Sequence, residues 1–96
     1  MKKQILLNTL RSLKKDARAL YNSELHGIFG SYAREDQSDE SDVDILVKFL
    51  PGATLLDLTG LGNFLEQKLN IKVDVISDRA IRDEIKPYIN KDLIVI

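Results

Sequence analysis

Hydrophobic residues recur at steps of three and four along two long segments, the spacing that places them on one side of an α-helix. The first predicted helix covers residues 3–20, and its apolar side comprises Leu6, Leu10, Leu13, Ala17 and Leu20. The second covers residues 55–69, and its apolar side comprises Leu55, Leu56, Leu58, Leu61, Phe64, Leu65 and Leu69. A shorter helix is predicted over residues 79–86, because Pro87 interrupts a helix that reaches it.

Strands are indicated where apolar and polar residues alternate, or where a short apolar run ends at a glycine. Residues 25–29 form such a run before Gly30, and residues 42–49 and 71–76 alternate. Successive side chains of a strand point to opposite faces, so the central segment has two different sides. One side carries Val43, Ile45, Val47 and Phe49, and the other carries Asp42, Asp44, Leu46 and Lys48.

The remaining segments connect these elements. Residues 31–36 are expected to form a helical turn capped by Ser31, and residues 37–41 a polar loop. Residues 93–96 are either a final edge strand or a tail that packs on a partner. The order of helices and strands predicts one α+β domain over residues 1–96, with a small mixed β-sheet flanked by helices.

Composition limits the classes of function. The formal net charge is −1, so there is no general attraction to nucleic acid or to an anionic membrane. No stretch approaches the length of a membrane span, and a cytoplasmic protein is expected. The chain has no cysteine, so a metal would be held by oxygen atoms or by the lone His26, which is expected in the core or behind a metal ligand.

Asp42, Asp44 and Asp74 are the candidate metal ligands. Asp42 and Asp44 are two residues apart on a predicted strand, so both carboxylates leave the same face. Asp74 has an equivalent position on the next strand and would face the same spot if the strands are neighbours. Oxygen ligands suit Mg²⁺ or Mn²⁺, and three carboxylates could hold two ions. The same pattern also fits a solvated acidic surface, because residues 35–44 contain six acids and no base.

Gly30 and Ser31 join a predicted strand to a predicted helical turn. Glycine lets the backbone approach a phosphate closely, and the free N–H groups at the start of a helix favour anions. The Ser31 hydroxyl adds a donor. A Gly-Ser pair in this place also fits an ordinary turn, so the pair gains meaning only beside the carboxylates.

The combined pattern resembles the DNA polymerase β-like nucleotidyltransferase superfamily. Gly30-Ser31 is followed after ten residues by Asp42-Val43-Asp44, and the fuller strings 30–34 and 41–47 are similar to those of the minimal nucleotidyltransferases of prokaryotes. Residues 73–76 match the place where that family has its third metal carboxylate. The resemblance covers nearly the whole chain, and it implies the polymerase β-like nucleotidyltransferase fold.

The resemblance also implies roles for single residues. Gly30 and Ser31 would bind the nucleotide phosphates, and Asp42, Asp44 and Asp74 would ligate Mg²⁺. Asp74 could also accept the proton of the attacking hydroxyl. Arg34 would support the acidic loop or contact a phosphate, or else form a structural salt bridge with Asp39 or Asp42. One departure is visible, because many relatives have glycine where this chain has Glu35.

The expected reaction is the transfer of a nucleoside monophosphate, AMP from ATP, to a hydroxyl acceptor. Minimal members of the family commonly act as antitoxins that adenylylate a tyrosine of a helical HEPN ribonuclease toxin, so such a toxin is the implied partner. Two alternatives stay open: an antitoxin that acts by binding alone, and a transferase that modifies a small molecule such as an antibiotic. The sequence does not fix the acceptor, the nucleobase or the oligomeric state, a homo-oligomer included.

Overall fold

A four-stranded mixed sheet organises the chain, and the computed structural model describes all residues, 1–96. The strands lie in the order β3-β2-β1-β4, with bounds β1 Ser23–Phe29, β2 Val43–Phe49, β3 Val73–Ser77 and β4 Ile94–Val95. β2 pairs in parallel with β3, whereas β1 pairs antiparallel with β2 and with β4. The predicted α+β fold with a mixed sheet is confirmed, and the last residues of the chain form an edge strand.

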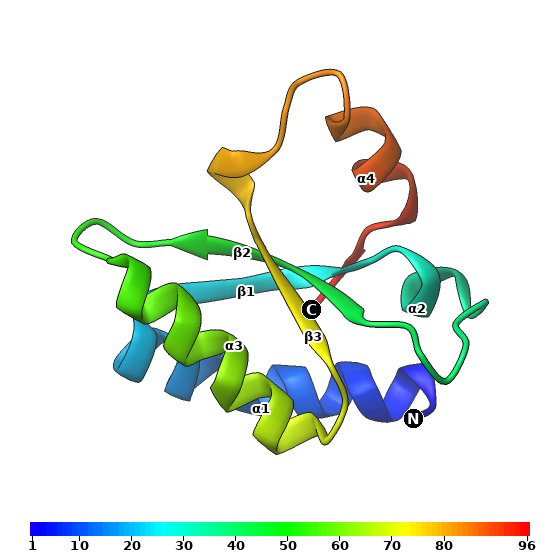
Figure 1. The fold of residues 1–96 in the computed structure, drawn as a ribbon, viewed down its shortest axis with the longest axis horizontal. Helices are drawn as coiled ribbons and strands as arrows, with labels where there is room; N and C mark the ends of the chain where they lie inside the picture. The colour runs from blue at the N-terminus through cyan, green and yellow to red at the C-terminus, as the bar shows by residue number, and fades with distance from the viewer.

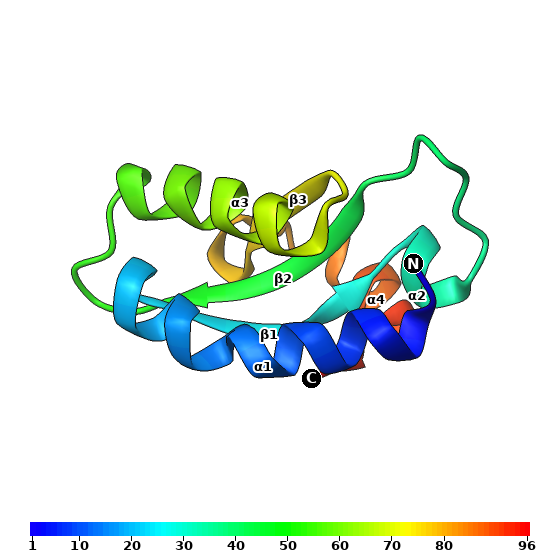
Figure 2. The same ribbon diagram turned by 90° about the horizontal axis from the view of Figure 1, so that it is seen from below.

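Helices cover the two faces of the sheet unequally. Their bounds are α1 Lys3–Tyr21, α2 Ser31–Arg34, α3 Leu55–Leu69 and α4 Lys86–Asp92, with a 3₁₀ helix η1 at Asp78–Ala80. Figures 1 and 2 show α1 and α3 side by side on one face, α4 on the other face and α2 at the end of β1. None of these helices is both long and apolar enough to cross a membrane.

The α1 helix buries the predicted stripe except at its end. Its buried side chains are Leu6, Leu7, Leu10, Leu13 and Ala17. The prediction was wrong for Leu20, which is 59% exposed. Tyr21 takes its place against α3, where its ring lies 5.4 Å from that of Phe64 and against the backbone of Gly60. The left-handed conformation of Asn22 then ends the helix.

The α3 helix begins with a reciprocal capping box between Thr54 and Asp57 and buries Leu61, Leu65 and Leu69. Its predicted apolar side was wrong at the N-terminus, because Leu55 and Leu56 are 75% and 83% exposed. Figure 1 shows the reason: the first turn of α3 lies beyond the end of β2, where no strand is present to cover it.

The helix predicted over residues 79–86 is not present. The chain instead forms the 3₁₀ helix η1 and then turns, and the α-helix α4 follows from Lys86 to Asp92. Pro87 lies in the first turn of α4. Proline is compatible with this position because the first N–H groups of a helix have no partner within it. Pro87 was therefore wrongly interpreted as the end of a helix when it lies at the beginning of one.

Candidate active site

The predicted site residues come together at one edge of the sheet, where β1 ends and β2 and β3 begin. In the strand register, Asp44 lies between Phe29 of β1 and Asp74 of β3. Gly30 follows Phe29 directly, and Asp42 precedes the first residue of β2. Three segments that are distant in the sequence are thus adjacent in space, which is the arrangement that the spacing of the carboxylates required.

The pleat of β2 decides which way the carboxylates point. Val43, Ile45 and Val47 are completely buried in the core that α1 and α3 cover. Because side chains alternate along a strand, Asp42 and Asp44 face the opposite side of the sheet. Asp74 is opposite Asp44 in a parallel pair and belongs to the same side. Asp74 is exposed, whereas Asp44 is partly buried.

Gly30 lies directly against Asp44. Its backbone has φ 75° and ψ −152°, a conformation that is open to glycine almost alone. A Cβ built on Gly30 would overlap the Oδ2 atom of Asp44 and lie 3.3 Å from its Cγ. Two features therefore require a glycine here: the backbone conformation, and the Asp44 carboxylate that occupies the space a side chain would need.

Ser31 does not cap the helical turn as predicted. Gly30 occupies the capping position, no side chain caps α2, and Ser31 is its first helical residue. The carbonyl of Ser31 accepts a hydrogen bond from the Asp36 N–H at 3.0 Å. The Ser31 side chain is partly exposed, next to the glycine that touches Asp44.

The electrostatic environment of Asp44 favours a cation. Burial raises the pKa of its carboxyl group, repulsion from Asp74 and then Asp42 raises it further, and Arg34 acts against this. None of the three aspartates takes part in the five ion pairs of the chain. The negative charge at this edge of the sheet is thus left without a direct partner from the protein.

The chemistry of these donors fits a hard divalent cation, since all of them are carboxylate oxygens. However, no three His, Cys, Asp or Glu side chains are gathered in an arrangement that could hold a metal ion. The backbone register places Asp42, Asp44 and Asp74 on one face, but their side chains are not drawn together around a common point. Metal binding by this trio stays a prediction.

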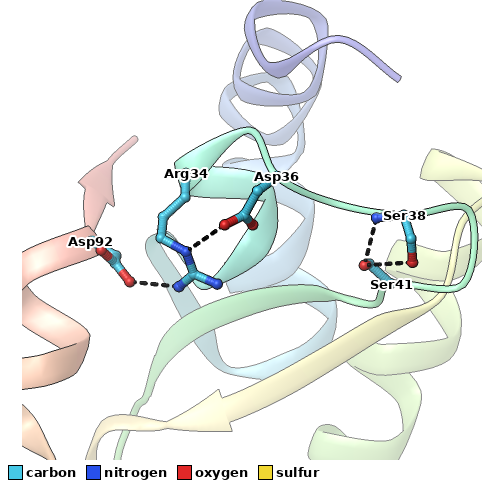
Figure 3. A network of polar contacts seen from close by, with 5 residues as sticks. All are labelled: Arg34, Asp36, Ser38, Ser41 and Asp92. Carbon is cyan, nitrogen blue, oxygen red and sulfur yellow. Dashed lines mark hydrogen bonds and ion pairs between the residues drawn. The ribbon is translucent and has the colours of Figure 1, made fainter.

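Arg34 forms two ion pairs, neither of them with a predicted partner (Figure 3). Its Nε donates to Asp36 Oδ2 at 3.1 Å, and its Nη1 donates to Asp92 Oδ2 at 2.8 Å. The hydrogen bond to Asp92, and then that to Asp36, raises the pKa of Arg34. The proposed salt bridge with Asp39 or Asp42 was wrong, because α4 brings another carboxylate closer.

Glu35 occupies a position that suits glycine. Its φ is 61° and its ψ is 32°, so it ends α2 in the left-handed conformation. A glycine would adopt this conformation without the strain that a side chain brings. The Glu35 side chain is 3.7 Å from Lys3 Nζ, a loose and exposed contact. The loop that follows is closed by a hydrogen bond from the Ser38 N–H to Ser41 Oγ at 2.9 Å (Figure 3).

Two aromatic residues near the sheet have simpler roles. His26 is exposed and not in the core, because it alternates with the buried Leu25 and so lies on the other face of β1. Tyr32 is buried in the core and packs there. The residue that the sequence did not reveal is Asp92, which contacts Arg34 from 58 positions away. A basic residue beside an acidic loop suggested local partners and gave no signal for one on α4.

Comparison with protein families gives a clear result. The profile of the family described as "Nucleotidyltransferase domain" matches residues 10–95, which is most of the chain. The chain belongs to this nucleotidyltransferase family. The matched region includes β1, α2, β2 and β3 and so all the predicted site residues.

Two curated relatives are named as protein adenylyltransferases. This nucleotidyltransferase is 42% identical over 88 residues to "Putative protein adenylyltransferase MJ0126" of Methanocaldococcus jannaschii, a match that covers 91% of this chain and 90% of the relative. It is 31% identical over 87 residues to "Protein adenylyltransferase MntA" of Thermococcus cleftensis, with 91% and 88% covered. The chain is an enzyme of the nucleotidyltransferase class.

Solved structures agree on the fold. A protein described as a "putative minimal nucleotidyltransferase" is 33% identical, with a TM-score of 0.74 over 92% of this chain and 93% of that one. A second structure is the complex of an MNT antitoxin with the tri-AMPylated HEPN toxin of Shewanella oneidensis. It is 20% identical, with a TM-score of 0.69 over 97% of this chain and 70% of that one, and so shows likeness in fold.

Proposed function

We propose that this nucleotidyltransferase transfers AMP from ATP to a tyrosine hydroxyl of a partner protein, a helical HEPN toxin that the transfer silences. The names of the two curated relatives support the reaction, and the structure of an MNT antitoxin with an AMPylated toxin supports the partner. The observation that carries the proposal is the placement of Gly30 against Asp44, in register with Asp74.

The residues divide between phosphate and metal binding. The backbone of Gly30 and the backbone and hydroxyl of Ser31 would receive the triphosphate, because a glycine lets a phosphate approach the backbone closely. Asp42, Asp44 and Asp74 would hold Mg²⁺, two ions being proposed and Mn²⁺ being a substitute. When bound, the metal would neutralise charge on the phosphate oxygens and the leaving pyrophosphate.

The transfer is a displacement at the α-phosphorus of ATP. The acceptor oxygen forms a bond to this phosphorus, the bond from the phosphorus to the bridging oxygen of the β-phosphate breaks, and pyrophosphate leaves with both electrons of that bond. The acceptor proton must be removed, and the exposed Asp74 carboxylate is the proposed base. Positioning of the two reactants and electrostatic stabilisation together supply most of the catalysis in such transfers.

The proposal is tested with ATP labelled at the α-phosphorus, Mg²⁺ and a helical protein encoded beside this chain. We expect label on a tyrosine of the neighbour, and none with the double variant Asp42→Asn/Asp44→Asn. Asp39→Asn is the matched control, because it removes an exposed acid of the neighbouring loop and should retain activity.

Other outcomes separate the alternatives. A tight complex that forms without any label would mean an antitoxin that acts by binding alone. Label that appears on a small hydroxylated molecule and not on protein would make the chain a small-molecule transferase. Either result would overturn transfer to a tyrosine of the partner.

A further inference from the structure

The side chain of Arg34 is held from two directions on the side facing α4. Asp36 follows it closely in the sequence, while Asp92 is the last residue of α4 (Figure 3). The contact with Asp92 is the shorter, at 2.8 Å against 3.1 Å, and its carboxylate is the less exposed, at 22% against 58%. Asp92 is therefore the stronger of the two constraints on the guanidinium.

Asp44 is the site carboxylate on which Arg34 already acts through space. The Arg34 N–H donates to the Gly30 carbonyl at 3.1 Å, so the two residues are one helical turn apart, and Gly30 touches Asp44. Arg34 is also the one basic group that stabilises the charged form of Asp44 through space. A guanidinium that turned toward Asp44 could form a charge-assisted bidentate pair with its carboxylate.

We propose that Asp92 is a positioning residue that, with Asp36, holds Arg34 away from Asp44 and so keeps the site carboxylates available to a divalent cation. The inference rests on the proposed metal site. An arginine paired with Asp44 would occupy the place of the metal, since both neutralise the same oxygens. The ion pair with Asp92 thus acts by exclusion and needs no contact with metal or nucleotide.

The arrangement also links α4 to the site. α4 has no fully buried residue, so little apolar packing fixes its position. The Arg34–Asp92 pair is a direct side-chain connection from α4 to α2 at the site, with 58 residues between the partners. The availability of the carboxylates therefore depends on where α4 lies.

The test measures Mn²⁺ binding by the chain alone, with electron paramagnetic resonance to count the free ion. We expect Asp92→Ala to weaken Mn²⁺ binding by about fivefold, the size expected for releasing a partly exposed ion pair. Asp83→Ala is the matched control, because it removes an acid near α4 that pairs with Lys86 at 3.1 Å. Equal affinities of these two variants would overturn the proposal.

A background that lacks Arg34 distinguishes two explanations: that Asp92 holds Arg34 away from the site, and that the charge of Asp92 itself favours metal binding. In Arg34→Ala, the further change Asp92→Ala should have no more effect than Asp83→Ala, because no guanidinium remains to occupy the site. If Asp92→Ala weakens binding by fivefold there as well, Asp92 acts by its own charge and positioning is refuted. If wild type and Asp42→Asn/Asp44→Asn bind Mn²⁺ equally, the metal site itself is wrong, and the inference falls with it.

Discussion

Replacing Gly30 with alanine tests the centre of the proposed site. The substitution adds one methyl group at a residue with φ 75° and ψ −152°, where an L side chain is strained. The new Cβ would also overlap Asp44 Oδ2, so the carboxylate would have to turn aside. Backbone strain and displacement of Asp44 are separate costs, and a second substitution can separate them.

The structure shows both perturbations, and each has a typical size. The backbone conformation should cost about 1–3 kcal/mol for alanine, and forcing Asp44 from its rotamer about 0.5–1.5 kcal/mol. Gly30→Ala should therefore lower the free energy of unfolding by about 1.5–4.5 kcal/mol. In an Asp44→Ala background only the backbone part remains, because the surviving Asp44 Cβ would be 3.7 Å away, an ordinary contact.

Wild type, Gly30→Ala, Asp44→Ala and the double variant form a double-mutant cycle. Their unfolding in urea, followed by circular dichroism, gives the coupling energy between the two positions. Gly52→Ala is the matched control: Gly52 has φ 90°, but nothing lies within 4 Å of the place a Cβ would take, so its effect should not depend on Asp44. An equal loss for Gly30→Ala with and without the Asp44 side chain would refute the reasoning. We also expect Gly30→Ala to lose nucleotidyl transfer while it is still folded.

Three further substitutions test single features. Glu35→Gly should be about 1 kcal/mol more stable than Glu35→Ala in urea unfolding, because φ is 61° at this position, and equal values would contradict the left-handed assignment. Asp44→Asn should stabilise the metal-free chain at neutral pH. The pKa of Asp44 is raised in the folded chain, so the protonated carboxyl group favours folding, and this contribution to stability is lost as the pH rises through the folded pKa. The gain in the free energy of unfolding should vanish when the pH is below the usual pKa of an aspartate, and a gain that persists at that pH would refute the prediction. Mg²⁺ should stabilise only the wild type. Pro87→Ala should change stability by less than about 1 kcal/mol, whereas a helix-interrupting proline would give a gain near 3 kcal/mol on removal.

The spacing of apolar residues was sufficient to predict most of the fold. The core residues Leu6, Leu10 and Leu13 of α1 and Val43 and Ile45 of β2 are buried as their periods require. The failures at Leu20, Leu55 and Leu56 occur at the ends of helices. Periodicity reports which side of a helix is apolar, but not where the neighbouring sheet stops, which depends on tertiary structure.

The candidate site, like the fold, was predictable from the sequence only in part. The motif from Gly30 to Asp44 is local in sequence, and the period of the strand predicts that both aspartates share a face. The contact between Gly30 and Asp44 needed the structure, as did the ion pair of Arg34 with Asp92. These two contacts depend on side-chain positions across elements, for which a single sequence contains no signal.

The topology explains why so short a chain can assemble this site. β2 and β3 are parallel and joined by α3, so their N-terminal ends lie at the same edge of the sheet. β1 is antiparallel to β2, so its C-terminal end, with Gly30, reaches that edge as well. A shift of one residue in the β2–β3 register would turn Asp74 to the other face. The site therefore depends on the crossover through α3 as well as on the carboxylates, because the crossover sets which residue of β3 lies opposite Asp44.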